Sequence, residues 1–267
     1  MRHIVASLAW STAFRLLGVG SAFFINVVLA RLLSPDDFGQ YLIAFSLVMF
    51  VAIFMRFGIK QTTMKLTANA RNRGDPIELR STIYSIFAYT LVTTLISAAV
   101  LLFGLAEWVF LNVFASPQLA YANVWFVIWA APIALAAPVG ETLRALHRPG
   151  WGVALDMSAQ SAVLLIVASF LLLFQVDFRL REVLRVWCMV SWIVVAAGVV
   201  RLNSLIPLSG FKRSVHIPFF SIFRSAWPIF ILNFSTYLTA NASLWVVGNM
   251  LGHSEAALYG VAVRIFN

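Results

Sequence analysis

Charged residues are scarce in this sequence, and their scarcity excludes most soluble folds. They make up 11% of the 267 residues, whereas a soluble domain needs about a quarter of its residues charged to cover its surface. Hydrophobic residues reach 61%, and the mean hydropathy is strongly positive. This composition predicts an all-α fold, a polytopic transmembrane helix bundle.

Residues that carry enzyme chemistry are also few. The single cysteine, Cys188, excludes an internal disulfide, and the four histidines are scattered without metal-ligand spacing. The sequence has no phosphate-binding glycine loop with lysine, no nucleophile elbow and no paired carboxylates at a shared depth. We therefore expect no metal, no cofactor and no enzymatic activity.

Basic residues outnumber acidic ones, which gives a formal charge of +9. In a soluble protein this excess would suggest nucleic acid as the partner. Here the bases lie in short links between apolar runs, so membrane lipids are the expected partner and no nucleic acid is. Twelve of the nineteen lysines and arginines fall on one side of the predicted topology and four on the other. This bias predicts a cytoplasmic N-terminus.

Seven apolar runs are long enough to cross a bilayer as helices. They are Leu8–Ala30, Gly39–Ile59, Ser81–Leu105, Tyr121–Leu143, Val153–Phe174, Val183–Ile206 and Ser225–Asn249. An eighth run opens at Ala256 and is still apolar at Asn267, where twelve residues of helix reach only about 18 Å. We therefore expect the sequence to be a fragment of a longer protein.

The first span carries an arginine, Arg15, which costs at least about 2.5 kcal/mol near the centre of a membrane helix. Steps of one helical turn place Ser11, Arg15, Gly18, Ala22 and Asn26 in one polar, small-residue stripe. This stripe predicts a wet interior in which Arg15 binds an anion and Asn26 lines the same cavity. The alternative is a structural arginine that bonds a neighbouring helix or extends to the membrane surface.

Three further charges, Arg56, Glu141 and Asp156, fall near the predicted cytoplasmic ends of spans two, four and five. They are candidates for a gate whose ion pairs break as the inner mouth opens. The alternative is interfacial charges with local partners, such as Glu141 with Arg144 three residues on.

The seventh span is unusually polar for a membrane helix. Within it, Asn233, Tyr237 and Asn241 are candidate sugar contacts. Hydrogen bonding between helices explains many such residues equally well.

The segment after the first span is echoed after the seventh, 218 residues later. Leu33 matches Leu251, Tyr41 matches Tyr259, and an acid at Asp37 is kept as Glu255. An acid at that place suits the N-terminal end of a helix. The echo predicts a duplicated six-helix unit, and parallel repeats of this kind are typical of transporters.

The segments Leu29–Tyr41 and Asn249–Ala262 also carry a family resemblance. They resemble links of the bacterial polysaccharide flippases, which belong to the multidrug, oligosaccharidyl-lipid and polysaccharide exporter superfamily. The resemblance implies two six-helix lobes around a cationic cavity, and export of an undecaprenyl-diphosphate-linked glycan by alternating access. It places the protein in the bacterial inner membrane, with polysaccharide polymerase or assembly proteins as possible partners.

On this basis residues 1–206 are expected to form the first lobe, 207–224 a cytoplasmic linker and 225–267 the start of the second lobe. The expected cargo is a lipid-linked oligosaccharide for O-antigen or exopolysaccharide synthesis. Two alternatives stay open: a multidrug exporter of the same superfamily, and a membrane scaffold that transports nothing. A drug exporter would need a buried acid for its cationic cargo, whereas this lobe offers a buried arginine.

Overall fold

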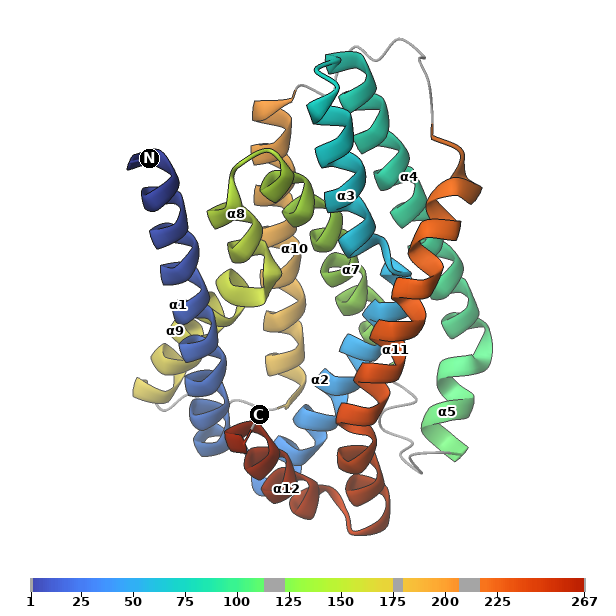
Figure 1. Ribbon diagram of the computed structural model, residues 1–267. Coiled ribbons are helices and arrows are strands. Elements are labelled where there is room, and N and C mark those ends of the chain that lie inside the picture. Colours follow the sequence, from blue (N-terminus) through green and yellow to red (C-terminus); the bar gives the residue numbers. More distant parts are fainter. Residues whose placement is uncertain (1, 113–122, 175–179, 207–216, 267) are drawn as a thin grey trace.

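The computed structural model describes residues 2–112, 123–174, 180–206 and 217–266, and these ranges contain helices but no strand (Figure 1). The helices of the first half are α1 (Arg2–Leu32), α2 (Pro35–Arg56), α3 (Ile59–Asn72), α4 (Pro76–Val100), the π-helical turn η1 (Leu101–Leu105) and α5 (Ala106–Asn112). Those of the second half are α7 (Asn123–Ala145), α8 (Pro149–Val153), the π-helical turn η2 (Ala154–Ser158), α9 (Ala159–Leu173), α10 (Leu180–Leu205), α11 (Phe219–Met250) and α12 (His253–Phe266).

Six helices of the described part are long and apolar enough to cross a membrane. They occupy Thr12–Leu32, Pro35–Arg56, Pro76–Gly104, Val124–Ala145, Leu180–Leu205 and Phe219–Met250. The pair Pro149–Asp156 and Ala159–Leu173, bent by 52° at the break, is either a broken seventh span or a re-entrant loop. The six helices and the bent pair each overlap a predicted span, and the prediction of an all-α polytopic bundle is confirmed.

The membrane-spanning helices alternate in direction along the chain, and α3 continues in the direction of α2 (Figure 1). In Figure 1 the N-terminus, the α3–α4 turn, the α7–α8 turn and the adjoining ends of α10 and α11 lie at the upper end. The α1–α2 and α11–α12 turns lie at the lower end. The basic links were predicted to share one side, and the described ends of these links do so. That this side is cytoplasmic stays a prediction.

Two helix starts follow directly from local sequence. Ser34 caps α2 by accepting a 3.1 Å hydrogen bond from the backbone N–H of Asp37, and Pro35 occupies the first helical position. Asp75 caps α4 in the same way through the N–H of Ile77 at 2.8 Å. Gly74, at φ +76°, makes the turn before it.

Helix α3 lies in the basic link between the predicted spans Gly39–Ile59 and Ser81–Leu105, where no helix was predicted. It forms because one of its faces is buried against α4 and α7 while polar residues cover the other. Helix α11 begins at Phe219, inside the stretch predicted as an interlobe linker, and residues 207–216 lie outside the described residues.

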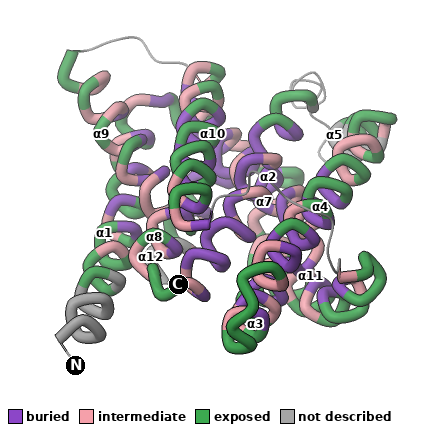
Figure 2. Tube along the Cα trace, turned by 90° about the horizontal axis from the view of Figure 1, so that it is seen from above, coloured by how far each residue is buried: buried purple, intermediate pink, exposed green. Residues whose placement is uncertain are grey.

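Helix α2 is the centre of the bundle. In the most apolar 18-residue stretch of its span 72% of the residues are buried, a larger share than in the corresponding stretch of any other span of the described part (Figure 2). Its aromatic side chains form a seam with α11, in which Phe50 packs on Trp245, Phe54 on Phe234, and Phe57 on Phe230 at 4.2 Å between ring centroids. Large offset rings supply extensive apolar contact, so the seam holds α11 against α2.

The boundaries of the last two helices repeat those of the first two. Helix α1 ends at Leu32 and α11 at Met250, while α2 begins at Pro35 and α12 at His253. Both pairs are 218 residues apart, the offset of the sequence echo. The α11–α12 hairpin therefore follows the helix boundaries of the α1–α2 hairpin.

Helices α2 and α12 cross at short range. A Cβ placed on Gly39 would lie 1.8 Å from the backbone oxygen of His253, and one on Gly260 would lie 2.6 Å from a Leu42 methyl carbon. Leu42 and Gly260 are themselves 218 residues apart, so equivalent positions of the echo touch. Contact between equivalent positions is expected where a pseudo-twofold axis relates two hairpins.

We expect Gly39→Ala to destabilise the protein, because the added methyl group forces α2 and α12 apart. Overpacking of this kind costs about 1–3 kcal/mol. The matched control is Gly20→Ala in α1, where a Cβ would meet nothing within 4 Å. Thermal unfolding of the detergent-solubilised protein should show a lower midpoint for Gly39→Ala and no loss for Gly20→Ala. Equal midpoints would contradict the close crossing.

Candidate functional site

The candidate site is built around a break between α2 and α3. Phe57 and Gly58 both adopt left-handed backbone conformations, with φ of 37° and 70°. A Cβ on Gly58 would lie 2.1 Å from the carbonyl oxygen of Ala226 in α11, so only glycine fits there. The break reorients the chain between Arg56, the last residue of α2, and Lys60 in the first turn of α3.

The backbone carbonyls near this break are satisfied by side chains of α4. The Thr93 hydroxyl donates to the Met55 carbonyl at 2.7 Å, and the Tyr89 hydroxyl donates to the Phe57 carbonyl at 3.4 Å. Within a membrane no water replaces such partners, so a broken helix is tolerated only where protein groups bond the freed backbone. The break between α2 and α3 is therefore stabilised by specific hydrogen bonds.

A second irregularity faces the first. The turn η2 is π-helical and joins α8 to α9, and it carries Asp156. A π-helical turn shifts the register of the side chains around the helix, and such turns are frequent at functional sites. Helix α1 packs closely on η2, because a Cβ on Gly18 would lie 2.2 Å from the hydroxyl oxygen of Ser158.

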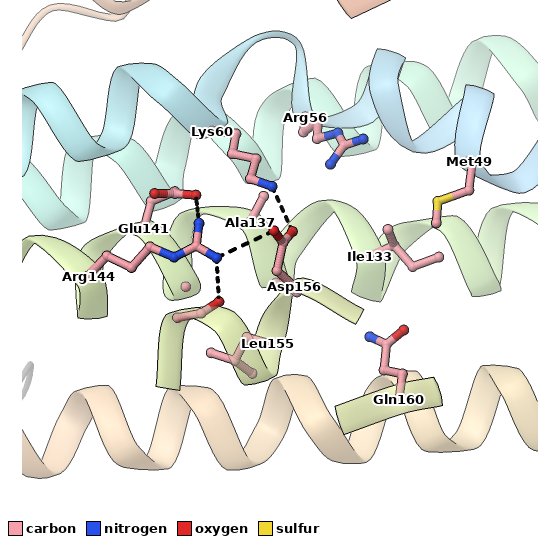
Figure 3. Close-up of a pocket in the computed structure, with 13 residues that line it drawn as sticks. Met49, Arg56, Lys60, Ile133, Ala137, Glu141, Arg144, Leu155, Asp156 and Gln160 are labelled. Carbon is pink, nitrogen blue, oxygen red and sulfur yellow. Dashed lines mark hydrogen bonds and ion pairs between the residues drawn. The ribbon is translucent and has the colours of Figure 1, made fainter. Parts of the chain in front are cut away.

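Four charged side chains meet between these irregular turns (Figure 3). The Lys60 ammonium lies 2.6 Å from Oδ1 of Asp156, and the Arg144 guanidinium lies 3.4 Å from Oδ2 of the same carboxylate. Arg144 also pairs with Glu141 and donates to the Gly152 carbonyl at 3.0 Å. The network ties α3, α7, α8 and η2 together.

These groups line a cavity of about 250 Å³. Its wall also includes Arg56, Gln160 and the apolar side chains Met49, Ile133 and Leu155. Arg56 makes no hydrogen bond or ion pair with any residue of the described ranges, and Figure 3 shows its guanidinium facing the other pocket residues. The cavity holds three bases and two acids, so it carries one surplus positive charge.

Gln160 in α9 is fully buried, at 0% exposure. Its Oε1 lies 3.4 Å from the Ser191 hydroxyl of α10, while its Nε2 has no partner among the described residues. Burying an amide group without a partner is unfavourable. Gln160 thus presents an unused polar group to the same cavity that Arg56 lines.

The structure brings the three predicted gate residues, Arg56, Glu141 and Asp156, to one cavity. The local pairing of Glu141 with Arg144, weighed as the alternative, is also present. The two interpretations are compatible, because Arg144 bridges both carboxylates.

The other predicted site residues lie elsewhere. Arg15 is exposed on α1 away from this cavity, as is Ala22 of its stripe, while Gly18 is buried against η2. Asn26 is half-buried and donates to the Ala22 carbonyl at 2.5 Å. Neither Arg15 nor Asn26 contributes to the cavity wall.

On α11, Asn233, Tyr237 and Asn241 are half-buried. The Tyr237 hydroxyl donates to the Ser46 carbonyl of α2 at 2.8 Å, and the Asn241 amide donates to the Tyr237 carbonyl at 3.0 Å. Tyr237 therefore bonds between helices, which was the alternative to sugar contact, and the Asn241 bond lies within its own helix.

Sequence reasoning missed Lys60 and Gln160 as pocket residues and treated Arg144 only as a local partner. Lys60 was counted with the basic link, because the α2–α3 break leaves no trace in hydropathy. Gln160 lies one helical turn after Asp156, near the start of the predicted span Val153–Phe174. A polar residue at that spacing was the one available signal.

The fold and cavity define a multi-pass helical membrane protein with a net cationic pocket between its helices. A comparison with protein families then identifies the family: the model described as "Polysaccharide biosynthesis protein" matches residues 4–267. The chain belongs to this family, as the resemblance indicated, and the family's proteins are transporters or flippases rather than enzymes. Neither the curated proteins nor the solved structures gave a match.

We expect Glu141→Gln to destabilise the protein by about 1–3 kcal/mol, because it removes the charge-assisted bond between the buried Glu141 carboxylate and the half-buried Arg144. The control is Glu78→Gln, which breaks an ion pair with the largely exposed Arg73. Exposed pairs contribute about 1 kcal/mol at most. Thermal unfolding in detergent should separate the two variants. A midpoint for Glu141→Gln no lower than that for Glu78→Gln would exclude a stabilising role for the buried pair.

Proposed function

We propose that this protein is a flippase that carries an undecaprenyl-diphosphate-linked oligosaccharide across the bacterial inner membrane by alternating access. The cargo then serves O-antigen or exopolysaccharide synthesis. The family match supports a transporter for polysaccharide biosynthesis. The observation that carries the finer proposal is the surplus cation, Arg56, in a cavity between membrane helices.

Arg56 suits a diphosphate for a geometric and an electrostatic reason. A guanidinium presents a planar fork of donors that bonds phosphate oxygens in pairs, and charge-assisted bonds of this kind are about twice as strong as neutral ones. The donors of Arg56 are unused by the described residues, whereas Lys60 and Arg144 are already paired. An entering phosphate therefore bonds Arg56 without first breaking the network.

The size of the cavity limits what enters it. At about 250 Å³ it is smaller than the roughly 300–1,000 Å³ of ordinary small-molecule sites, and so it cannot enclose an oligosaccharide. In this proposal the cavity receives the headgroup region only, while the remaining sugars lie outside it and the polyprenyl tail stays in lipid. Arg15, Asn26, Asn233 and Asn241 remain candidates for contacts along that outer path.

The ion-pair network is proposed to act as a gate. Lys60 on α3 and Arg144 on α7 both hold Asp156, so separation of these helices breaks the pairs at one carboxylate. An anionic headgroup that arrives at Arg56 competes with Asp156 for the nearby bases. Substrate entry and gate opening are coupled in this way.

A multidrug exporter of the same superfamily is less well supported. A cationic drug needs an unpaired acid, yet both carboxylates of the cavity are paired with bases. Among the cavity's charged groups only Arg56 makes no ion pair within 4 Å in the described structure, although it is attracted by the Asp156 charge, and it repels a cation. A scaffold that transports nothing gives Arg56 no role in export at all.

Replacement of Arg56 tests the proposal. In cells that depend on this protein for surface glycan, Arg56→Ala should lower export per molecule of membrane protein by about ten- to hundred-fold, because one charge-assisted contact is lost. Arg56→Lys should retain part of the activity, since it keeps the charge and loses the fork. The matched control, Arg31→Ala at the exposed end of α1, should export normally.

Export is quantified as surface glycan divided by the amount of protein in the membrane fraction. Normal export per molecule by Arg56→Ala would refute the headgroup site and leave the scaffold as the better account. Equal losses in Arg56→Ala and Arg31→Ala would indicate a general effect of removing positive charge.

The same assay tests Arg15, which the structure leaves exposed on α1. If Arg15 contacts the diphosphate on the outer path, Arg15→Ala should insert at normal abundance and lose export, and Arg15→Lys should recover part of it. A structural arginine predicts that both variants lose abundance instead. Normal export per molecule by Arg15→Ala would remove Arg15 from the transport path.

A further inference from the structure

The cavity contains two unused polar groups, and they belong to different helices. Arg56 ends α2, and Gln160 lies in the first turn of α9. Figure 3 shows them on separate parts of the wall, with Asp156 and Ile133 labelled between them. A single ligand that serves both groups must therefore carry an anionic end and a second polar end.

Of the two groups, the buried amide of Gln160 has the greater need of a hydrogen-bond partner. Its side chain is fully buried, and its amide nitrogen has no acceptor among the described residues. The Ser191 hydroxyl, 3.4 Å from its Oε1, is already bonded to the Trp187 carbonyl at 2.7 Å. A buried amide in this position gains a hydrogen bond only from something that enters the cavity.

The residues that line the cavity and the volume of the cavity limit which ligands can bind there. Met49, Ile133 and Leu155 give the cavity apolar surface alongside its charges. A cavity of about 250 Å³ accepts one small ring rather than a chain of rings. A sugar fits these walls, because its C–H groups contact apolar side chains and its hydroxyls both donate and accept hydrogen bonds. A hydroxyl therefore satisfies the amide of Gln160 whichever of its atoms faces the cavity.

We propose that this cavity is a sugar-phosphate site, in which Arg56 binds the phosphate and Gln160 bonds a hydroxyl of the attached sugar. The inference rests on the proposed function for one point only, the source of the ligand. In a flippase the sugar phosphate is the reducing-end sugar with its adjoining phosphate, so that Gln160 distinguishes a glycosylated carrier from a bare one. A free sugar phosphate has the same chemistry.

Binding to the purified full chain tests the site directly. The probes are glucose 1-phosphate, inorganic phosphate and glucose, titrated by calorimetry. The wild type should bind glucose 1-phosphate about tenfold more tightly than inorganic phosphate, as expected for one additional hydrogen bond. Gln160→Met, which is similar in volume, should bind the two phosphates equally, because it cannot bond the sugar. Arg56→Lys should weaken both.

The control is Gln40→Met, in which the lost side chain donates to Asp36 in the first turns of α2, far from the cavity. It should keep the tenfold preference. The thermal midpoint of ligand-free Gln160→Met should equal or exceed that of the wild type, because an unpaired buried amide has been removed. A wild type without preference for the sugar phosphate, or a Gln160→Met variant that keeps it, would overturn the inference.

The source is decided by competition in nanodiscs. Displacement of glucose 1-phosphate by undecaprenyl diphosphate that carries one sugar, and not by bare undecaprenyl diphosphate, supports the lipid source. Displacement by neither lipid leaves the site to a free sugar phosphate. Failure of the inference is distinct from failure of the proposed function: loss of export in Arg56→Ala without a sugar preference removes only the inference. A preference for the sugar phosphate together with normal export by Arg56→Ala would refute only the proposed flippase function.

Discussion

The constraint on which this structure depends is that a membrane interior offers no water to charged or unbonded polar groups. Five charged side chains nevertheless meet among the helices, and four of them are tied together by ion pairs. The pairing explains why the charges gather in one place instead of being spread through the spans. It also makes Arg56, which the described structure leaves unpaired, the feature that requires an explanation outside the protein.

The same constraint accounts for where the helices break. The α2–α3 break is stabilised by hydroxyls of α4 and by the close approach of α11 at Gly58, and the π-helical turn places Asp156 opposite it. The irregular turns therefore position the charges, of which Glu141 is buried and Asp156 is exposed.

Much of the fold could be predicted from the sequence, because long apolar runs and cap residues are local signals. The six spans, the turn at Gly74 and the repeated helix boundaries all follow from them. The charged cluster was predicted only in part: Arg56, Glu141 and Asp156 share a depth, whereas Lys60 and Gln160 join them through the break and through packing against α10. The depth of a residue in the membrane follows from its position along an apolar run. Contacts between helices that are distant in the sequence cannot be inferred in this way. The polar stripe that contains Arg15 is a local signal that did not locate the cavity. Its residues recur at helical spacing, yet Arg15 does not line the cavity.

The central claim is that the unpaired guanidinium of Arg56 holds a diphosphate. Native mass spectrometry of the protein released from membranes that contain undecaprenyl diphosphate and its sugar-bearing forms measures this most directly. The account predicts that the wild type retains these lipids in preference to phosphatidylglycerol, and that Arg56→Ala loses the preference while Arg31→Ala keeps it. Retention of the diphosphate lipids by Arg56→Ala at the wild-type level would contradict the account.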